Sequence, residues 1–291
     1  MNTTTPTFAF IGAGRVATAL ARTMSHRGMP VTHVASRDPQ SAARLAADLP
    51  DCSPVEPARA AAADVVFLTV PDDDIAAVAA QLPWKSGQMA VHCSGATEIS
   101  VLDPAARAGA LTGGFHPLQI FSDPELAERR LAGSFVAIEG PPPLAARLQE
   151  VAGLLEMRVL HLPPGARARY HGAASFAASF LVSMLEEAAA IWASFGVGED
   201  DALEALLPLA YGTLDAARSK GFAGALAGPL SRGDADVVQG HLRDLDRLGA
   251  GHGALYREFA RRQLDLLERG GRLDQARLWP MRELLGNEGK S

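Results

Sequence analysis

The stretch "TFAFIGAGRVATALA", residues 7–21, decides the fold of the first half of the chain. A short apolar run ends at Gly12-Ala13-Gly14, and alanine-rich sequence follows. This order predicts a buried strand, a tight turn and a helix. Two glycines one residue apart let the backbone turn sharply, and they leave room for a phosphate to approach without meeting a side chain.

The spacing G-x-G-x-x-A, which ends at Ala17, is typical of dinucleotide-binding turns when a strand precedes it and a helix follows. The free N–H groups and the dipole at the start of that helix attract an anion. We therefore expect a pyrophosphate to bind at a turn and first helical residues made up of Gly12, Ala13, Gly14, Arg15 and Val16. The alternatives are a purely structural turn and, for Arg15, a solvated helix residue.

The second predicted strand, in "VTHVASRDP" (residues 31–39), determines the choice of coenzyme. It ends in Ser36 and Arg37, and a hydroxyl with a guanidinium can hold a 2′-phosphate. We therefore predict NADP (NADPH) rather than NAD. Asp38 complicates this choice, although it could also begin the next turn or cap the next helix.

The first half alternates short apolar runs with helical stretches, and this pattern predicts a parallel sheet. After Pro163-Pro164-Gly165 no strand is expected. The predicted fold class is α/β: a Rossmann-type doubly wound parallel sheet (1–162) followed by an all-α C-terminal domain (163–291). We expect seven strands, at 8–11, 31–36, 65–70, 89–93, 111–115, 135–138 and 158–162. The predicted helices lie at 16–24, 39–49, 75–81, 143–155, 176–195 (long and buried), 199–217, 231–248 and 252–268.

Composition excludes several classes of function. The net charge of −6 provides no basic field for nucleic acid. Two cysteines form neither a disulfide framework nor a zinc spacing, so a reducing cytoplasm and no metal are expected. The N-terminus lacks a targeting pattern. Glu186 and Glu187 interrupt the most apolar later stretch, so no membrane span is predicted.

Ligands of parallel sheets bind beyond the carboxyl ends of the strands. Val70 and Pro71 are therefore expected near the coenzyme ribose, and Ser94 and Gly95 near the nicotinamide. The acidic residues 72–74 are expected to begin a helix. His92, within a strand, is expected to be a core histidine with its hydrogen bonds satisfied.

The segment "GGFHPLQIF", residues 113–121, contains the first candidate for a proton donor. Pro117 favours an extended or turning backbone around His116, whose ordinary pKa of about 6.5 suits proton transfer to a carbonyl oxygen. Gln119 adds an amide that could bind substrate. The alternative is a structural histidine bonded to a backbone carbonyl.

Polar residues in the helical half recur every four positions, at His171, Ser175, Ser179 and Ser183. They predict either a wet stripe facing a cleft or close helix packing. Arg232, at the start of a predicted helix, could hold a substrate carboxylate, with Asp234 beside it. The alternative is a surface loop in which Ser231 and Asp234 form a capping box.

Taken together and in order, "FIGAGRVATAL", "SGA", "GFHPLQIF", "FVAIEG", "YHGAASFAASFL", "LAGPLSRGD" and "HLRDL" resemble a bacterial family that joins a Rossmann-like domain to the helical domain DUF2520. That family is similar to 6-phosphogluconate dehydrogenases, ketopantoate reductases and F420-dependent NADP oxidoreductase-like proteins. The resemblance implies a nucleotide site at Gly12, Gly14, Ser36 and Arg37, and a cleft lined by Ser94, His116, Gln119, His171, Arg232 and Asp234. Ser179 stands where many members carry asparagine.

These observations predict an NADP(H)-dependent oxidoreductase that reduces a small polar carbonyl, such as a 2-oxo acid similar to ketopantoate, or an imine. His116 is the first candidate for the proton donor and His171 the second. A non-catalytic nucleotide-binding or redox-sensing protein is the alternative, and a deazaflavin partner is a further one. A homodimer formed through the helical domain is expected.

Overall fold

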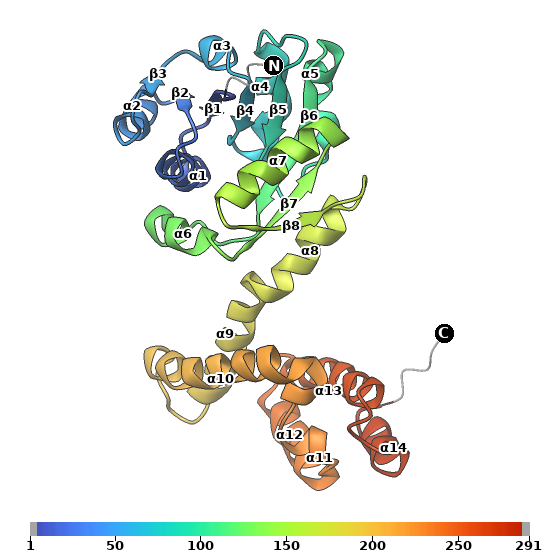
Figure 1. The fold of residues 1–291 in the computed structure, drawn as a ribbon. Helices are drawn as coiled ribbons and strands as arrows, with labels where there is room; N and C mark the ends of the chain where they lie inside the picture. Colours follow the sequence, from blue (N-terminus) through green and yellow to red (C-terminus); the bar gives the residue numbers. More distant parts are fainter. Residues whose placement is uncertain (1–4, 287–291) are drawn as a thin grey trace. The chain divides into compact units, whose positions relative to one another are not determined.

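The structure is a computed structural model that describes residues 5–286. The chain divides into two compact units between Phe176 and Ala177. The first unit is α/β and the second is all-α, as the element labels in Figure 1 show. Each unit is described by itself below.

An eight-stranded sheet forms the centre of the first unit, in the order β3-β2-β1-β4-β5-β6-β7-β8. All neighbouring strands are parallel except β6 and β7. From β1 the chain builds outward to β3 and then returns to place β4 on the other side of β1, which creates the switch point where ligands bind in such sheets. The strands are β1 (Phe8–Ile11), β2 (Val31–Ala35), β3 (Ser53–Pro54), β4 (Val65–Leu68), β5 (Met89–His92), β6 (Leu111–Pro117), β7 (Phe135–Glu139) and β8 (Arg158–His161).

Helices cover both faces of this sheet. On one face lie α1 (Arg15–His26), α2 (Pro39–Ala47), α6 (Pro124–Leu131) and α7 (Pro142–Leu154). On the other lie α3 (Pro57–Ala60), α4 (Ile75–Gln81) and α5 (Asp103–Arg107), with the 3₁₀ turns η1 (Asp72–Asp74) and η2 (Ile99–Leu102). Every residue of β1 and β4 is buried, as expected for strands covered on both faces.

The predicted Rossmann-type fold is confirmed, and each of the seven predicted strands is present. The two-residue β3 was missed because Ser53 and Pro54 are exposed and carry no apolar signal. The helix α8 (Arg167–Ala177) follows β8, and all but its last residue belongs to the first unit. The division between units therefore falls later than the predicted position near Pro163.

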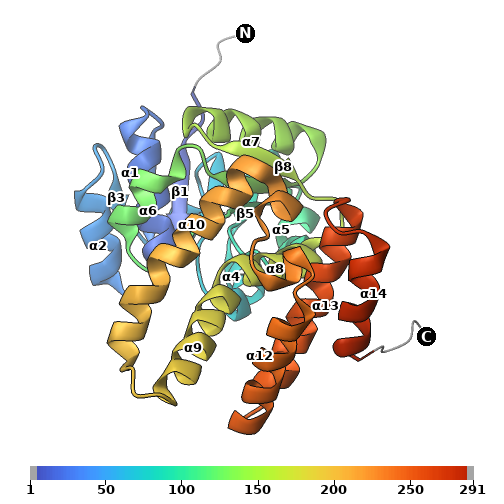
Figure 2. The same cartoon turned by 90° about the horizontal axis from the view of Figure 1, so that it is seen from below.

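The second unit contains two small cores. The helices α9 (Ser179–Ala193) and α10 (Glu199–Ala225) lie side by side (Figure 2). Their core contains Ala189, Ala202 and Leu206. A second core joins the remaining helices: α11 (Pro229–Arg232), α12 (Ala235–Leu248), α13 (His252–Arg269) and α14 (Gln275–Leu284).

The prediction of one long buried helix over 176–195 is wrong. The helix breaks at Ala178, where the backbone has φ −120° and ψ −97°, so the stretch is divided between α8 and α9. Within α9 only Ala189 is buried, because the other described helices cover little of its apolar surface. By length and composition alone, one helical stretch of residues 5–286, Arg167–Ala193, could cross a membrane.

Candidate functional site

The turn after β1 requires glycine at its first position. Gly12 has φ +107°, and a Cβ placed there would lie 2.5 Å from the carbonyl oxygen of Thr69, in the loop after β4. Its N–H donates to the carbonyl of Ala35 at the end of β2. Gly12 therefore lets three strand ends approach one another closely.

Gly14 has a different role, because its φ of −83° is open to any residue and a Cβ there would point into open space. It is the N-cap of α1, which has neither a capping side chain nor an acidic residue in its first turn. The N–H groups of Arg15, Val16 and Ala17 therefore have no partner within the helix. The turn fits a phosphate, since an anion can fill both the open space and these donors.

Arg37 and Asp38, which follow β2, favour different coenzymes, and their side chains have different partners. Asp38 caps α2 by accepting hydrogen bonds from the N–H groups of Gln40 (3.1 Å) and Ser41 (3.2 Å). Bonds from the Ser41 hydroxyl and these amides lower the pKa of Asp38. The Arg37 side chain is 91% exposed, and among residues 5–286 it has only a 3.8 Å ion pair with Asp74. Arg37 is thus available to a ligand, whereas both oxygens of Asp38 are occupied.

The loops after β4 and β5 are tied together by Ser94. Its buried hydroxyl donates to Asp72 Oδ2 (2.7 Å) and accepts from the N–H groups of Ala96 and Thr97. Asp72 therefore does more than begin a helix. Val70 is half-buried and Pro71 is exposed at the same strand end.

Two histidines meet beside Gly95. His116, on β6, and His171, on α8, have ring centroids 6.0 Å apart. A Cβ on Gly95 would lie 2.8 Å from His116 Nε2 and 2.6 Å from His171 Cδ2, so only glycine leaves room for both rings. His116 Nδ1 lies 2.9 Å from the hydroxyl of Tyr170. The sequence indicated His116 and His171 as candidate proton donors, but it did not indicate a role for Tyr170.

A buried arginine holds α8 against the sheet. Arg167 is fully buried, with its Nε 2.7 Å from Glu139 Oε2 on β7 and its Nη1 2.6 Å from the carbonyl oxygen of Ser94. A Cβ at Gly114 would overlap its guanidinium. Sequence reasoning missed this pair, because its members are 28 residues apart and the motif that contains Glu139, "FVAIEG", gives no sign of a distant partner.

Burial controls the charge of this site. Burial lowers the pKa of His116 to about 4, and the positive charges of His171 and Arg167 add to the shift. His116 is therefore neutral near pH 7, and the ordinary pKa on which its predicted role rested is not retained. Burial also raises the pKa of Tyr170 to about 12.

His92 lies on β5 with no solvent exposure, and both ring nitrogens lack a hydrogen-bond partner among the described residues. Burial lowers the pKa of His92 to about 3, with the charges of Arg167 and His116 adding to the shift. Its predicted place in the core is confirmed, whereas the prediction of satisfied hydrogen bonds is wrong.

Two predicted substrate residues make local hydrogen bonds, and a third lies at a helix break. Gln119 donates to the carbonyl oxygen of Arg130 (3.3 Å), and its own amide oxygen accepts from the N–H of Ile120 (2.8 Å). Ser175 bonds back to the carbonyl of His171 within α8. Ser179 begins α9, so the break at Ala178 interrupts the predicted polar stripe.

Arg232 and Asp234 lie in the second unit and pair with each other, Nε to Oδ2, at 2.8 Å. Gly233, with φ +75°, separates α11 from α12, and Asp234 makes no capping bond. Ser231 instead donates to the carbonyl of Gly228. The predicted capping box and continuous helix are therefore wrong, because the glycine ends the first helix.

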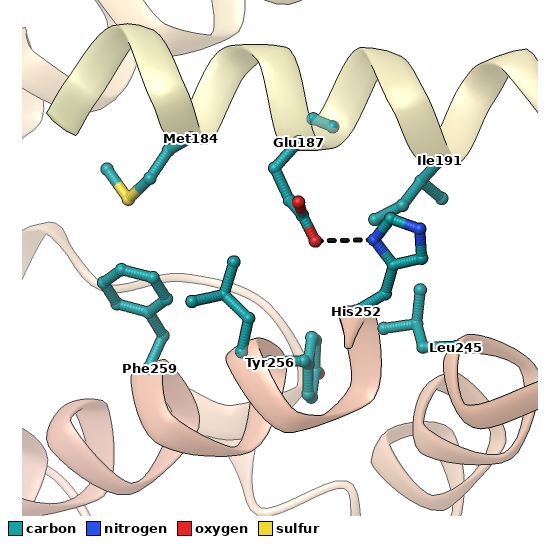
Figure 3. Close-up of a pocket in the computed structure, with 9 residues that line it drawn as sticks. Met184, Glu187, Ile191, Leu245, His252, Tyr256 and Phe259 are labelled. Atoms are coloured by element: carbon teal, nitrogen blue, oxygen red, sulfur yellow. Dashed lines mark hydrogen bonds and ion pairs between the residues drawn. The ribbon is translucent and has the colours of Figure 1, made fainter. Parts of the chain in front are cut away.

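The second unit also contains an apolar groove between α9 and α13 (Figure 3). Met184, Ile191 and Phe259 contribute to its walls. Glu187 Oε1 and His252 Nδ1 lie 2.6 Å apart in a hydrogen bond that bridges the two helices. Among residues 5–286 no group of three or more His, Cys, Asp and Glu side chains is arranged to hold a metal ion.

The fold and the glycine turn define a Rossmann-type dinucleotide-binding architecture followed by a helical unit. The Rossmann-like domain model matches residues 4–117, and the domain of unknown function DUF2520 matches residues 134–263. The chain thus combines a Rossmann-like domain with a DUF2520 domain, as the sequence resemblance predicted. No curated protein matches its sequence.

Solved structures share the architecture along most of the chain. Protein TM1727 from Thermotoga maritima is 23% identical with a TM-score of 0.76, over 91% of this chain and 99% of that one. The proposed NADP oxidoreductase BF3122 from Bacteroides fragilis is 25% identical with a TM-score of 0.70, over 91% and 98%. A reductive aminase from Aspergillus terreus, in complex with NADPH and ethyl levulinate, is 17% identical with a TM-score of 0.61, over 97% and 93%.

Proposed function

We propose that the protein is an NADP(H)-dependent oxidoreductase that reduces a small polar carbonyl compound, such as a 2-oxo acid similar to ketopantoate, or an imine. The observation that carries the proposal is the open, uncapped start of α1 at Gly14, beside an exposed Arg37. The names of the NADP oxidoreductase BF3122 and of the NADPH-bound reductive aminase support the same class.

The coenzyme would be held by residues of the first unit. The N–H groups that open α1 would bind the pyrophosphate, and Ser36 and Arg37 the 2′-phosphate. Ser94 and Gly95, at the carboxyl end of β5, would lie beside the nicotinamide. Bound NADPH supplies the hydride, while the protein orients the substrate and manages the proton.

The substrate's oxygen or nitrogen atom would face His116, with His171 as the second candidate for the proton donor. Arg232 is a separate candidate for binding a carboxylate, since Asp234 engages only one edge of its guanidinium. Both cysteines are free thiols, which fits the reducing cytoplasm that we propose as the location.

The experiment is an NADPH-oxidation panel of 2-oxo acids, with ketopantoate first, and of cyclic imines. Oxidation with at least one member supports the reductase. NADPH binding without oxidation across the panel would instead indicate the non-catalytic, redox-sensing alternative. Spectra with reduced F420 test for a deazaflavin partner.

We further propose that two copies pair through the second unit. On α10, Leu209 is 68% exposed, Tyr211 62% and Phe222 78%, while Leu255 and Phe259 stand partly exposed along the groove. The second unit thus exposes large apolar side chains on α10 and an apolar groove between α9 and α13, which a second copy could cover. Glu186 and Glu187 on α9 disfavour lipid as the covering partner.

Sedimentation equilibrium tests this pairing. A mass of two chains that falls to one chain on Leu209→Glu supports it, with Leu154→Glu on the first unit as the exposed control. A mass of one chain for the unaltered protein contradicts it.

A further inference from the structure

Tyr170 is joined to His116 across 54 residues of sequence by one side-chain hydrogen bond. The phenol oxygen lies 2.9 Å from Nδ1, and the ring planes meet at 87° with centroids 5.6 Å apart. Tyr170 stands on α8, which buried Arg167 fixes to the sheet. The position of the phenol therefore depends on a rigid helix rather than on a loop.

The donors and acceptors of the two groups allow two arrangements of the hydrogen bond between Tyr170 and His116. A phenol has one proton to give, and a neutral imidazole has one donor nitrogen and one acceptor nitrogen. If Nδ1 carried the proton, the phenol O–H would lack an acceptor among the described side chains. If the phenol donates, its O–H and Nδ1 are paired with each other, and the imidazole proton lies on Nε2, where it is free to bind a ligand.

The surroundings keep the pair in this form. The pKa of about 4 at His116 and of about 12 at Tyr170 leave both groups neutral near pH 7. The opposite edge of the His116 ring, Nε2, has no hydrogen-bond partner among residues 5–286, and it lies beside Gly95 and His171. A neutral N–H donor thus faces the carboxyl ends of β5 and β6.

We propose that Tyr170 is a positioning residue that fixes His116 in the Nε2–H tautomer, so that the site selects substrates with a hydrogen-bond acceptor at the reacting atom. A carbonyl oxygen satisfies this requirement. A protonated imine does not, because its N–H would oppose the N–H of His116. The inference rests on the proposed function, and within it favours carbonyl over iminium substrates.

The proton balance of the reduction is complete with this pair. As the carbonyl carbon accepts hydride from the coenzyme, the carbonyl π electrons move to the oxygen, which takes the proton from His116 Nε2. Nδ1 takes the phenolic proton of Tyr170. After the reduction Nδ1 returns that proton to the phenolate and water supplies a proton to Nε2, which restores the starting pair. The positive charge of Arg167 favours that phenolate.

The test is a long-range ¹H–¹⁵N spectrum of the full-length protein labelled at histidine nitrogen, in which His116→Gln identifies the His116 signals. We expect the Nε2–H pattern in the unaltered protein and its loss, as averaged tautomers, in Tyr170→Phe. Tyr256→Phe is the matched control, because Tyr256 makes the same contact with His241 Nδ1 (3.0 Å) in the second unit. An Nδ1–H pattern, or a spectrum that Tyr170→Phe leaves unchanged, overturns the proposal.

The substrate panel supplies the second readout. We expect carbonyl compounds to turn over faster than imines that are protonated at the assay pH, and Tyr170→Phe to lower kcat by about tenfold or more with little change in the KM for NADPH. Faster reduction of protonated imines would overturn the selectivity. Absence of all turnover would refute the proposed function, while the spectra would still decide the tautomer.

Discussion

Replacing Arg167 by methionine tests whether the buried ion pair fixes α8 to the sheet. The change leaves the Glu139 carboxylate, 9% exposed, without its partner, and the carbonyl of Ser94 without a donor. Removing one member of a buried pair costs about 3–5 kcal/mol. For a unit of this size, each kcal/mol corresponds to about 2–4 °C, so the Tm should fall by roughly 6–20 °C.

Thermal unfolding of four variants provides the assay: Arg167→Met, Glu139→Leu, the double change and a surface control. The control Arg22→Met removes a partly exposed pair with Asp48 and should cost at most about 1 kcal/mol. The double change Arg167→Met with Glu139→Leu removes both charges and should cost less than the sum of the two single changes. The reasoning is refuted if Arg167→Met behaves like the surface control, or if the two losses simply add.

Three further predictions concern the same unit. His92 and His116 are held neutral, with folded pKa values of about 3 and 4, so the unfolded chain binds more protons below the ordinary pKa of about 6.5. Stability is therefore full above that pH and is lost as the pH falls toward 4. At about pH 5 the protonation of His92 in the unfolded chain lowers the free energy of unfolding by about 2 kcal/mol. The Tm should therefore depend less on pH in His92→Leu than in the unaltered protein. An equal pH dependence would count against this cause. Gly14→Ala should change the free energy of unfolding by at most about 0.5 kcal/mol but weaken NADPH binding about tenfold or more. Gly12→Ala should instead lower the stability and the Tm. Calorimetry and thermal unfolding measure the two effects, and a reversed order would contradict the assignment. His116→Ala should lower turnover by about 10²–10⁴-fold without abolishing NADPH binding, and an unchanged rate in a steady-state assay would remove His116 from the reaction.

The fold of the first unit could be predicted well because its strands and turns are specified by neighbouring residues. The apolar runs that became β1 and β4 are buried on both faces, and Gly12 meets a backbone constraint that its position in the turn already indicated. Ser36 and Arg37 occupy the expected strand end, and the cap that Asp38 forms is one of the two roles its sequence allowed.

The missed features depend on distant partners. The role of Tyr170 depends on the packing of α8 against β6, which brings its hydroxyl to His116. The role of Arg167 depends on its contacts with Glu139 and Ser94. Neither contact can be inferred from nearby sequence. The low pKa of His116 is a consequence of burial that no spacing encodes. In the helical half, the periodicity of 176–195 correctly indicated helix but not burial, since an apolar stripe does not specify what covers it.

The central claim is that a nicotinamide coenzyme with a 2′-phosphate binds at the start of α1 and at Arg37. Calorimetric titration of the unaltered protein and of Arg37→Ala with NADPH and with NADH tests it most directly. We predict that NADPH binds about tenfold more tightly than NADH and that Arg37→Ala loses this difference. Tenfold is the lower end for a charge-assisted hydrogen bond, because Arg37 is exposed. Absence of heat with either coenzyme, or equal affinity for both in the unaltered protein, would contradict the account.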